Sequence, residues 1–329
     1  MPLGRIIGTG SALPAKKLTN QDIEKIVDTS DEWITTRTGI QCRYVSDAAT
    51  ATSDLAIAAA NKALESAGMT ADQLDLIIVA TSTPDHLNFP STACLVQYQL
   101  GARRAAAFDL SAACSGFVYS LTTADQFIRS GLYKNILVIG ADTLTKYLNW
   151  EDRNTCVLFG DGAGAVILQT SENERYGVLS SYLAADGSGG DLLMTPAGGS
   201  RKPITETVLK NKEQYITMDG KSVFKFSIRV IVDGIEKALS LAGLTQGDID
   251  LLIPHQANIR IINHAIEKLG LSPEKVCVNI QMYGNTSAAT IPIALDEAVR
   301  VGRLKKDMVV VMMGFGGGLT WGSNVIRWG

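Results

Sequence analysis

The chain has 329 residues, of which 46% are hydrophobic and 19% charged, and this composition suits a globular protein large enough for two cores. A formal net charge of -3 argues against a dedicated nucleic-acid binder, since such proteins are basic. No apolar run has the length of a membrane span, and the N-terminus lacks the apolar core of a signal peptide. The 5 cysteines include no CxxC pair and favour free thiols over disulfides or a zinc site. We therefore expect a cytoplasmic protein without membrane or nucleic-acid partners.

Strand and helix signals alternate along the first half of the chain. Short apolar runs between turn residues predict strands at 4–10, 74–81, 105–108, 135–142 and 159–168. Helical spacing of apolar residues behind capping residues predicts helices at 21–27, 52–67, 91–100 and 117–128, and one that carries Trp33. The segment 36–47, with Arg37 and Arg43, is expected to be a loop.

The stretch FDLSAACSGF places Cys114 between a buried strand and a helix. Unpaired N–H groups and the dipole at a helix N-terminus favour a negative charge, so this setting predicts a lowered thiol pKa. The neighbouring residues are small enough to admit a substrate, namely Ser111, Ala112, Ala113, Ser115 and Gly116. A buried structural cysteine is the alternative. Cys114 is therefore a candidate nucleophile, and the stretch alone leaves both readings open.

A sequence repeat relates the two halves of the chain. Residues 61–80, NKALESAGMTADQLDLIIVA, align without a gap to residues 236–255, EKALSLAGLTQGDIDLLIPH. Further on, FDLSAACSGF parallels VNIQMYGNTS, and RSGLYKNILVIG parallels RVGRLKKDMVVVMMG. We predict two fused copies of one α/β unit, residues 1–170 and 171–329, with mostly parallel sheets covered by helices. Residues 171–217 are expected to hold the first strands of the second copy and a surface excursion.

The repeat brings two more reactive residues toward Cys114. On the alignment Cys114 pairs with Gly284 or Asn285, and the strand LDLLIP ends at His255. We expect Cys114, His255 and Asn285 to end three strands and to face one crevice, because catalytic groups in α/β folds gather at the carboxyl ends of strands. His86 and His264 are better explained as surface residues. The sequence therefore favours a nucleophilic Cys114 over a structural one.

Two other functional readings fail on context. The glycine clusters GDGAG and GFGGGLTWG do not open a helix and lack the P-loop lysine, so they are interpreted as close backbone approaches rather than phosphate-binding loops. Their N–H groups could still form an oxyanion hole. The order Cys, His, Asn also occurs in papain-like proteases, but a CGSCW-type signature is missing and the duplicated α/β halves are unlike that fold.

At these residues the chain resembles β-ketoacyl-acyl-carrier-protein synthase III, the thiolase-fold condensing enzyme that starts fatty-acid synthesis. The resemblance covers essentially the whole chain and rests on DEWITTRTGI, AACSGF, GDGAGAVIL, PHQANIRII and YGNTSAAT. Thiolases and chalcone-type synthases lack the HQAN motif. The resemblance implies a five-layer αβαβα thiolase-like fold built from two duplicated halves, assembled as a homodimer.

Carried over residue by residue, the resemblance implies that Cys114 accepts an acyl group from acyl-CoA. His255 and Asn285 are implied to bind the malonyl thioester carbonyl and to promote decarboxylation. The backbone N–H groups of Cys114 and Gly317 would form the oxyanion hole. The residues implied to bind CoA and its pantetheine arm are Trp33, Arg37, Thr38, Arg153, Gly220, Phe224, Ala257 and Asn258.

The resemblance also implies partners. Phe89 would reach across the dimer to floor the acyl pocket of the other subunit, and Arg260 with Lys225 would dock acyl carrier protein. Lys221 and Asn154 depart from the family's usual residues at the CoA contacts. The implied substrates are CoA thioesters and malonyl-acyl-carrier protein, with no cofactor and no metal. A secondary-metabolite condensing enzyme and a non-catalytic partner of a condensing complex are the competing functions.

Overall fold

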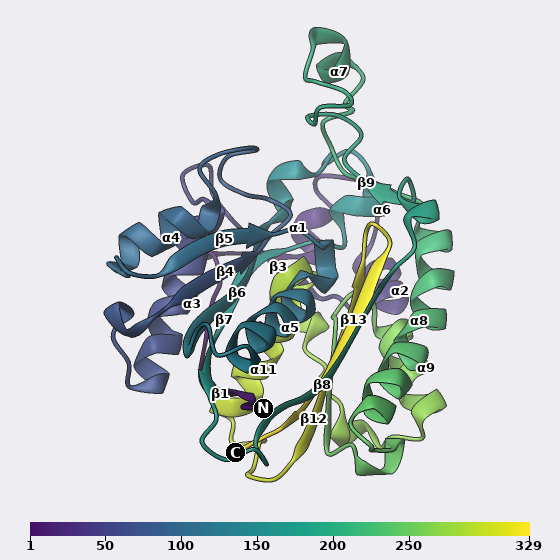
Figure 1. The fold of residues 1–329 in the computed structure, drawn as a ribbon. Coiled ribbons are helices and arrows are strands. Elements are labelled where there is room, and N and C mark those ends of the chain that lie inside the picture. The colour runs from purple at the N-terminus through teal and green to yellow at the C-terminus, as the bar shows by residue number, and fades with distance from the viewer.

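Two twisted sheets form the frame of the molecule in the computed structural model, which describes residues 1–329 (Figure 1). The first sheet has the order β1 (Gly4–Ala12), β7 (Asp161–Thr170), β6 (Asn135–Thr143), β4 (Leu76–Ala80) and β5 (Ala106–Leu110). The second has the order β11 (Leu251–Pro254), β12 (Val309–Gly316), β13 (Thr320–Arg327) and β8 (Gly177–Ala185).

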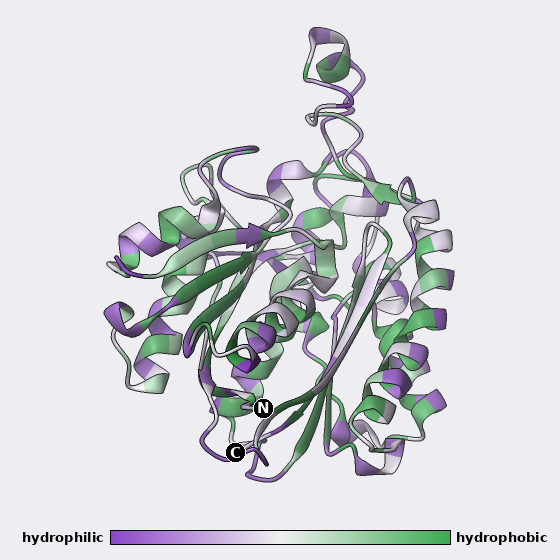
Figure 2. Ribbon diagram, viewed as in Figure 1, coloured by the Kyte–Doolittle hydropathy of each residue, from purple (hydrophilic) through white to green (hydrophobic).

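Helices cover both sheets and fill the space between them. The outer helices are α3 (Thr52–Ala67) and α4 (Thr92–Leu100) on the first sheet, and α8 (Gly220–Leu241) and α9 (Ile259–Leu269) on the second. The central layer consists of α5 (Gly116–Arg129) and α11 (Thr290–Arg300). Apolar clusters occupy each interface between layers, and the polar faces of the outer helices point to solvent (Figure 2). This confirms the predicted five-layer thiolase-like fold.

The two sheets share one connectivity, as the repeat predicts. In each sheet a helix and a 3-10 turn lead into a strand, β4 or β11, that pairs in parallel with a later strand, β6 or β12. Antiparallel pairs β6–β7–β1 and β12–β13–β8 complete the pattern, so the prediction of mostly parallel sheets is wrong. Where the first sheet has β5, the second has only a single parallel bridge from Val276 to Leu252. The boundary at residue 170 stays a prediction.

One detail of the predicted alignment is wrong. Cys114 lies in the 3-10 turn η2 (Ala113–Ser115), whose equivalent is η7 (Ser287–Ala289), because both turns precede a central helix. Both begin with a left-handed residue, Ala113 with φ 47° and Ser287 with φ 52°. The counterpart of Cys114 is therefore Ala288 and not Gly284 or Asn285. The short helix α10 (Ile280–Tyr283) adds residues that the ungapped alignment did not allow for.

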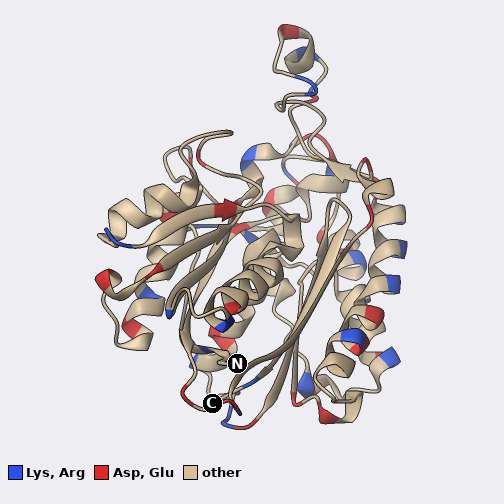
Figure 3. Ribbon diagram, viewed as in Figure 1, with Lys and Arg blue, Asp and Glu red and all other residues tan.

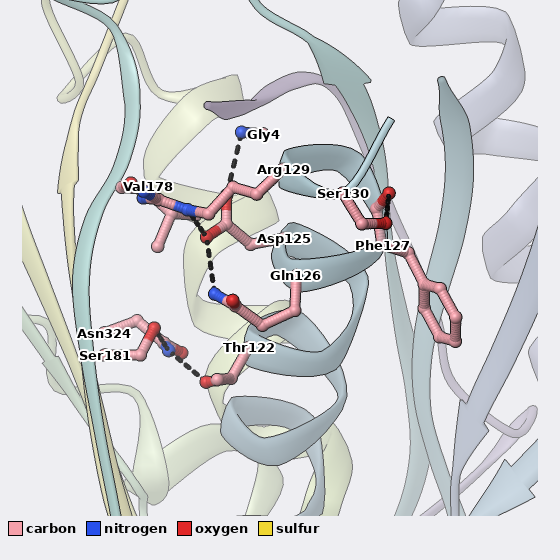
Figure 4. Close-up of polar contacts among 10 residues, drawn as sticks. All are labelled: Gly4, Thr122, Asp125, Gln126, Phe127, Arg129, Ser130, Val178, Ser181 and Asn324. Atoms are coloured by element: carbon pink, nitrogen blue, oxygen red, sulfur yellow. Dashed lines mark hydrogen bonds and ion pairs between the residues drawn. The ribbon is translucent and has the colours of Figure 1, made fainter. Parts of the chain in front are cut away.

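Polar contacts fix the buried helix α5 to both sheets (Figure 4). The Asp125 carboxylate accepts a hydrogen bond from the backbone N–H of Gly4 at 2.8 Å and pairs with Arg129 at 2.5 Å. Arg129 also donates to the carbonyl of Val178 on β8 at 2.6 Å. Asn324 on β13 donates to the Thr122 hydroxyl at 2.8 Å. These contacts hold α5, the helix that follows the Cys114 turn, against both sheets.

Smaller elements surround this frame. They are β2 (Lys16–Thr19), α1 (Asn20–Ile23), α2 (Asp31–Thr38), β3 (Cys42–Val45), α6 (Arg153–Cys156), β9 (Leu193–Met194), α7 (Glu206–Lys210) and β10 (Thr217–Met218). The predicted loop at 36–47 is partly wrong, since Arg37 lies in the last turn of α2 and Arg43 lies fully buried in β3. The expected excursion is an arm that carries α7 away from the body (Figure 1). No helix is both long and apolar enough to span a membrane.

Candidate active site

Cys114 lies at the turn that the sequence predicted, between β5 and α5, and is 6% exposed. Close packing with the second half fixes this turn. A Cβ added at Gly316, at the end of β12, would lie 2.7 Å from the Cys114 nitrogen, so only glycine lets the two segments meet here. Gly314 makes a similar approach, because a Cβ there would lie 3.0 Å from the Ser115 Cα.

The predicted lowering of the Cys114 pKa is wrong for the resting protein. Burial raises the pKa of the Cys114 thiol to about 12, a hydrogen bond with the Ser287 hydroxyl opposes this rise, and the Asp142 charge adds to it. The helix N-terminus is present, but desolvation of a thiolate outweighs it. Cys114 is therefore a protonated thiol at neutral pH and needs a proton acceptor to react.

His255 follows β11, as predicted, and is 1% exposed. Burial lowers the pKa of its imidazole to about 3, so the ring is neutral at neutral pH. Two contacts hold the ring. Its Nδ1 lies 2.7 Å from the Thr290 hydroxyl, and the ring of Phe315 packs edge-on with centroids 5.2 Å apart. A neutral imidazole held in this way can accept a proton through the remaining nitrogen, Nε2.

Asn285 does not end a strand, contrary to the prediction. It lies between α10 and η7, bridges to Phe159 beside β7, and is 7% exposed. Its Oδ1 accepts a hydrogen bond from the backbone N–H of Ser287 at 2.9 Å. This bond assigns the orientation of the amide and leaves its Nδ2 group to donate elsewhere.

Cys114, His255 and Asn285 line one narrow cavity of about 90 Å³. Its mostly apolar wall also includes four of the residues expected along the pantetheine arm, namely Gly220, Phe224, Ala257 and Asn258. A second, wider cavity of about 660 Å³ is also lined by Cys114, together with Gly317. The cysteine therefore lies where two cavities meet, one beside His255 and Asn285 and the other beside the glycine loop.

Aromatic and basic side chains gather outside the narrow cavity. The guanidinium groups of Arg37 and Arg153 lie 4.7 and 4.9 Å from the centroid of the Trp33 ring. Asn258 connects this group to the cavity, because its side chain donates to the carbonyl of Arg37 at 3.0 Å. Thr38 is different, since it is buried, its hydroxyl bonds within α2, and it lines neither cavity.

The remaining expected residues lie on the surface. Arg260 and Lys225 are exposed, and the Arg260 guanidinium lies 5.2 Å from the Phe224 ring centroid at the cavity wall. Further Lys and Arg positions lie along α8, and acidic positions follow them toward its C-terminus (Figure 3). Phe89 is 84% exposed, and the two residues before it, Leu87 and Asn88, line the wide cavity.

Sequence reasoning missed two residues of the site, Ser287 and Thr290. Both lie in the segment NTSAAT that begins with Asn285, and both contact candidate catalytic groups. The sequence offered one signal for them: both carry hydroxyl groups in a stretch of small residues beside a candidate catalytic asparagine. Nothing in the sequence alone places Thr290 against His255, because the contact joins β11 to α11.

The fold and the cysteine, histidine and asparagine at this cavity define a thiolase-fold enzyme. The family model for 3-oxoacyl-acyl-carrier-protein synthase III matches residues 108–187, and the model for its C-terminal part matches residues 239–328. A curated β-ketoacyl-acyl-carrier-protein synthase III from Caldanaerobacter subterraneus is 57% identical over 98% of this chain and 97% of its own.

Solved structures of the same family are also similar to this chain. The 3-oxoacyl-acyl-carrier-protein synthase III of Aquifex aeolicus has a TM-score of 0.91 and 50% identity, over 99% of this chain and all of that one. A priming β-ketosynthase from a polyketide pathway has the same TM-score of 0.91 but 32% identity, over 99% of this chain and 96% of its own. The chain belongs to the β-ketoacyl-acyl-carrier-protein synthase III family, and it is a condensing enzyme of the acyltransferase type.

Proposed function

We propose that this protein condenses a short-chain acyl-CoA with malonyl-acyl-carrier protein and so initiates fatty-acid biosynthesis. The products are 3-oxoacyl-acyl-carrier protein, CoA and CO₂. The observation that carries this proposal is the convergence of Cys114, His255 and Asn285 on one cavity, in a chain of this family. The proposed steps use the thiol, imidazole and amide of the chain itself, so they call for no cofactor and no metal.

In the first step Cys114 takes the acyl group from acyl-CoA. Its buried thiol needs a proton acceptor, and the neutral His255 in the same cavity suits that role. The backbone N–H groups of Cys114 and Gly317 would bind the oxyanion that forms on the acyl carbonyl. The close approach of Gly316 to the Cys114 backbone supports this placement of the glycine loop.

In the second step malonyl-acyl-carrier protein loses CO₂ and its carbanion attacks the acyl group on Cys114. Asn285 and His255 would bind the malonyl thioester oxygen, which becomes an enolate. An amide N–H suits this role because a carboxylate would repel the developing charge. The bond from Ser287 N–H to Asn285 Oδ1 supports the assignment, since it occupies Oδ1 and leaves the Nδ2 group to donate.

Both substrates arrive on a phosphopantetheine arm, and the narrow cavity has the residues to hold it. We place the nucleotide of CoA at Trp33, Arg37 and Arg153, because two guanidinium groups beside an aromatic ring suit a phosphorylated base. The pantetheine would follow Gly220, Phe224, Ala257 and Asn258. The buried Thr38 would support α2 rather than touch CoA.

Exposed Arg260 and Lys225 beside the mouth of this cavity would dock acyl carrier protein, which is acidic. We expect Arg260→Ala to raise the KM for malonyl-carrier protein and to flatten its salt dependence, because the lost contact is electrostatic. Acylation by acyl-CoA should hardly change. Lys268→Ala, at the other end of the same helix, is the matched control. Equal losses in both half-reactions would mean that Arg260 is structural.

We further propose a homodimer. Strand β5 forms an edge of the first sheet, and large apolar side chains stand exposed nearby, namely Leu87, Phe89 and Tyr98. Such surface is normally covered in an oligomer. The five free cysteines favour a reducing compartment, so we place the enzyme in the cytoplasm.

The test is intact-mass measurement after mixing the protein with a panel of acyl-CoA thioesters. A short-chain adduct that Cys114→Ser abolishes, and that Cys94→Ser retains, supports the proposal. A long or unusual acyl adduct would favour a secondary-metabolite condensing enzyme, and no adduct would favour a non-catalytic partner. An adduct that survives in Cys114→Ser would overturn the assignment of the nucleophile.

A further inference from the structure

Thr290 is the only side chain that hydrogen-bonds the His255 ring. Its Oγ1 lies 2.7 Å from Nδ1 of His255 and 3.1 Å from the carbonyl oxygen of Ser287. Thr290 is the first residue of α11, and its backbone N–H also bonds that carbonyl. The contacts therefore form a chain from the imidazole through one hydroxyl to the turn η7.

The hydroxyl has a single hydrogen, so it can donate to only one of its two neighbours. When it donates to the Ser287 carbonyl, it accepts from Nδ1, and the proton of neutral His255 lies on Nδ1. The other ring nitrogen, Nε2, then carries a lone pair. The ring is almost fully buried, so these protein contacts rather than bulk water select the tautomer.

The surroundings of the cavity favour this arrangement. Two of the polar side chains that share it with His255 are engaged elsewhere, since Ser227 donates to the Val223 carbonyl and Asn258 bonds to the backbone of Arg37 and Arg260. The others are the thiol of Cys114 and the Nδ2 group of Asn285, and both are hydrogen-bond donors. A ring nitrogen that faces hydrogen-bond donors is more stable without a proton, because it can then accept a hydrogen bond from them. Resting His255 would thereby be ready to receive the proton of Cys114.

We propose that Thr290 is a positioning residue that holds neutral His255 with its proton on Nδ1, so that Nε2 serves as the base for Cys114. This inference deepens the proposed function and rests on it. In acylation the S–H bond breaks as an Nε2–H bond forms, and the thiolate attacks the acyl carbonyl. The thioester bond of acyl-CoA then breaks and CoA leaves as a thiolate that solvent protonates. Nε2 keeps its proton until condensation releases the Cys114 thiolate, which takes that proton back.

The same tautomer orders the two donors of the second step. Asn285 can donate to the malonyl thioester oxygen from the start, whereas His255 can donate only after Nε2 has gained a proton. Loss of the Thr290 hydroxyl should therefore slow acylation more than it slows release of CO₂ from malonyl-carrier protein. A substitution that only disordered the site would slow acylation and release of CO₂ equally.

The experiment combines nitrogen-15 NMR of the three histidines with half-reaction kinetics. Spectra of the resting protein at neutral pH should show His255, assigned with His255→Gln, with a protonated Nδ1 and an unprotonated Nε2. Thr290→Ser keeps the hydroxyl and should keep both this spectrum and the acylation rate. Thr290→Val has nearly the same shape and should acylate roughly tenfold more slowly, the factor that one ordinary hydrogen bond is worth.

Two results would overturn the inference: a protonated Nε2 in the resting protein, or normal acylation by a folded Thr290→Val variant. The spectrum of the unmodified protein decides the tautomer even if Thr290→Val does not fold. Because that spectrum needs no substrate, it also separates this inference from the proposed function. A protein with the expected tautomer that forms no acyl adduct would contradict the function alone.

Discussion

At the scale of single residues, the thiol of Cys114 and the imidazole of His255 are a neutral pair. The thiol pKa is raised to about 12 and the imidazole pKa is lowered to about 3, in both cases chiefly by burial. Neither group therefore changes charge in the resting protein between these limits. The site stores an unionised nucleophile next to an acceptor and ionises it only during reaction.

This pair predicts an unusual pH dependence for chemical modification. Very little of the Cys114 thiol is ionised at pH 7, because burial raises its pKa to about 12. Alkylation of Cys114 by iodoacetamide should therefore keep rising with pH as far as the fold survives, and should not level off near pH 8. Site-resolved mass spectrometry measures this, with the exposed Cys94 as internal reference. A plateau below pH 8 would restore the lowered pKa that the helix N-terminus suggested.

At the scale of elements, the buried pair of Asp125 and Arg129 holds α5 in place. The side chain of Asp125 is 1% exposed and that of Arg129 is 19% exposed. Removing one partner leaves a largely buried charge unpaired, so we expect Asp125→Ala to lower the free energy of unfolding by about 3–5 kcal/mol. Denaturant titration measures this loss.

A second ion pair of the same spacing is the control. Asp233 and Lys237 on α8 are also four residues apart, but their side chains are 46% and 49% exposed. Asp233→Ala should cost less than about 1 kcal/mol, because water and salt screen exposed pairs. Equal losses in the two variants would show that α5 does not depend on its buried contacts.

Elements with local signals are the ones that the sequence predicted well. The helix from Thr52 to Ala67, ended by Gly68, was predicted to the residue, because the apolar spacing and the left-handed glycine are local features. Asn285 was placed on the wrong structural equivalent because α10 inserts a helical turn between short segments. The register of a repeat cannot be read through such an insertion.

The sequence predicted which residues line the cavity better than it predicted their pKa values and contacts. The expectation that Cys114, His255 and Asn285 face one crevice agrees with the structure, in which all three line one cavity, while their catalytic roles stay a prediction. The raised pKa of Cys114 and the contact of Thr290 with His255 were not predicted, because both arise where distant segments pack together. Burial and tertiary contact are properties of the assembled core.

At the scale of the whole molecule, the wide cavity beside Cys114 gives the proposed dimer a direct test. We expect Phe89→Asp to impair condensation, since Phe89 would close the partner's acyl cavity, and Cys114→Ala to abolish it. Mixing and refolding the two variants together should restore activity. In the mixed dimer one site would combine an intact Cys114 from one chain with an intact Phe89 from the other.

The restoration distinguishes two assemblies. If Phe89 served its own chain, every site in the mixed dimer would lack one of the two residues, and activity would not return. Analytical ultracentrifugation of each variant shows whether the dimer persists. Each variant refolded alone is the control for activity that does not come from mixed dimers.

The equivalent turns η2 and η7 of the two halves carry different residues, and this difference depends on both halves being in one chain. Each turn lies against a glycine of the opposite half, since a Cβ at Gly140 would lie 2.2 Å from the Ala288 carbonyl, as one at Gly314 would approach Ser115. A symmetric pair of such turns would set two identical side chains near one axis, where they would compete for the same substrate. Fusion into one chain frees the copies to diverge. One turn keeps the nucleophile, and the other, with alanine in its place, can specialise in holding the groups that serve it.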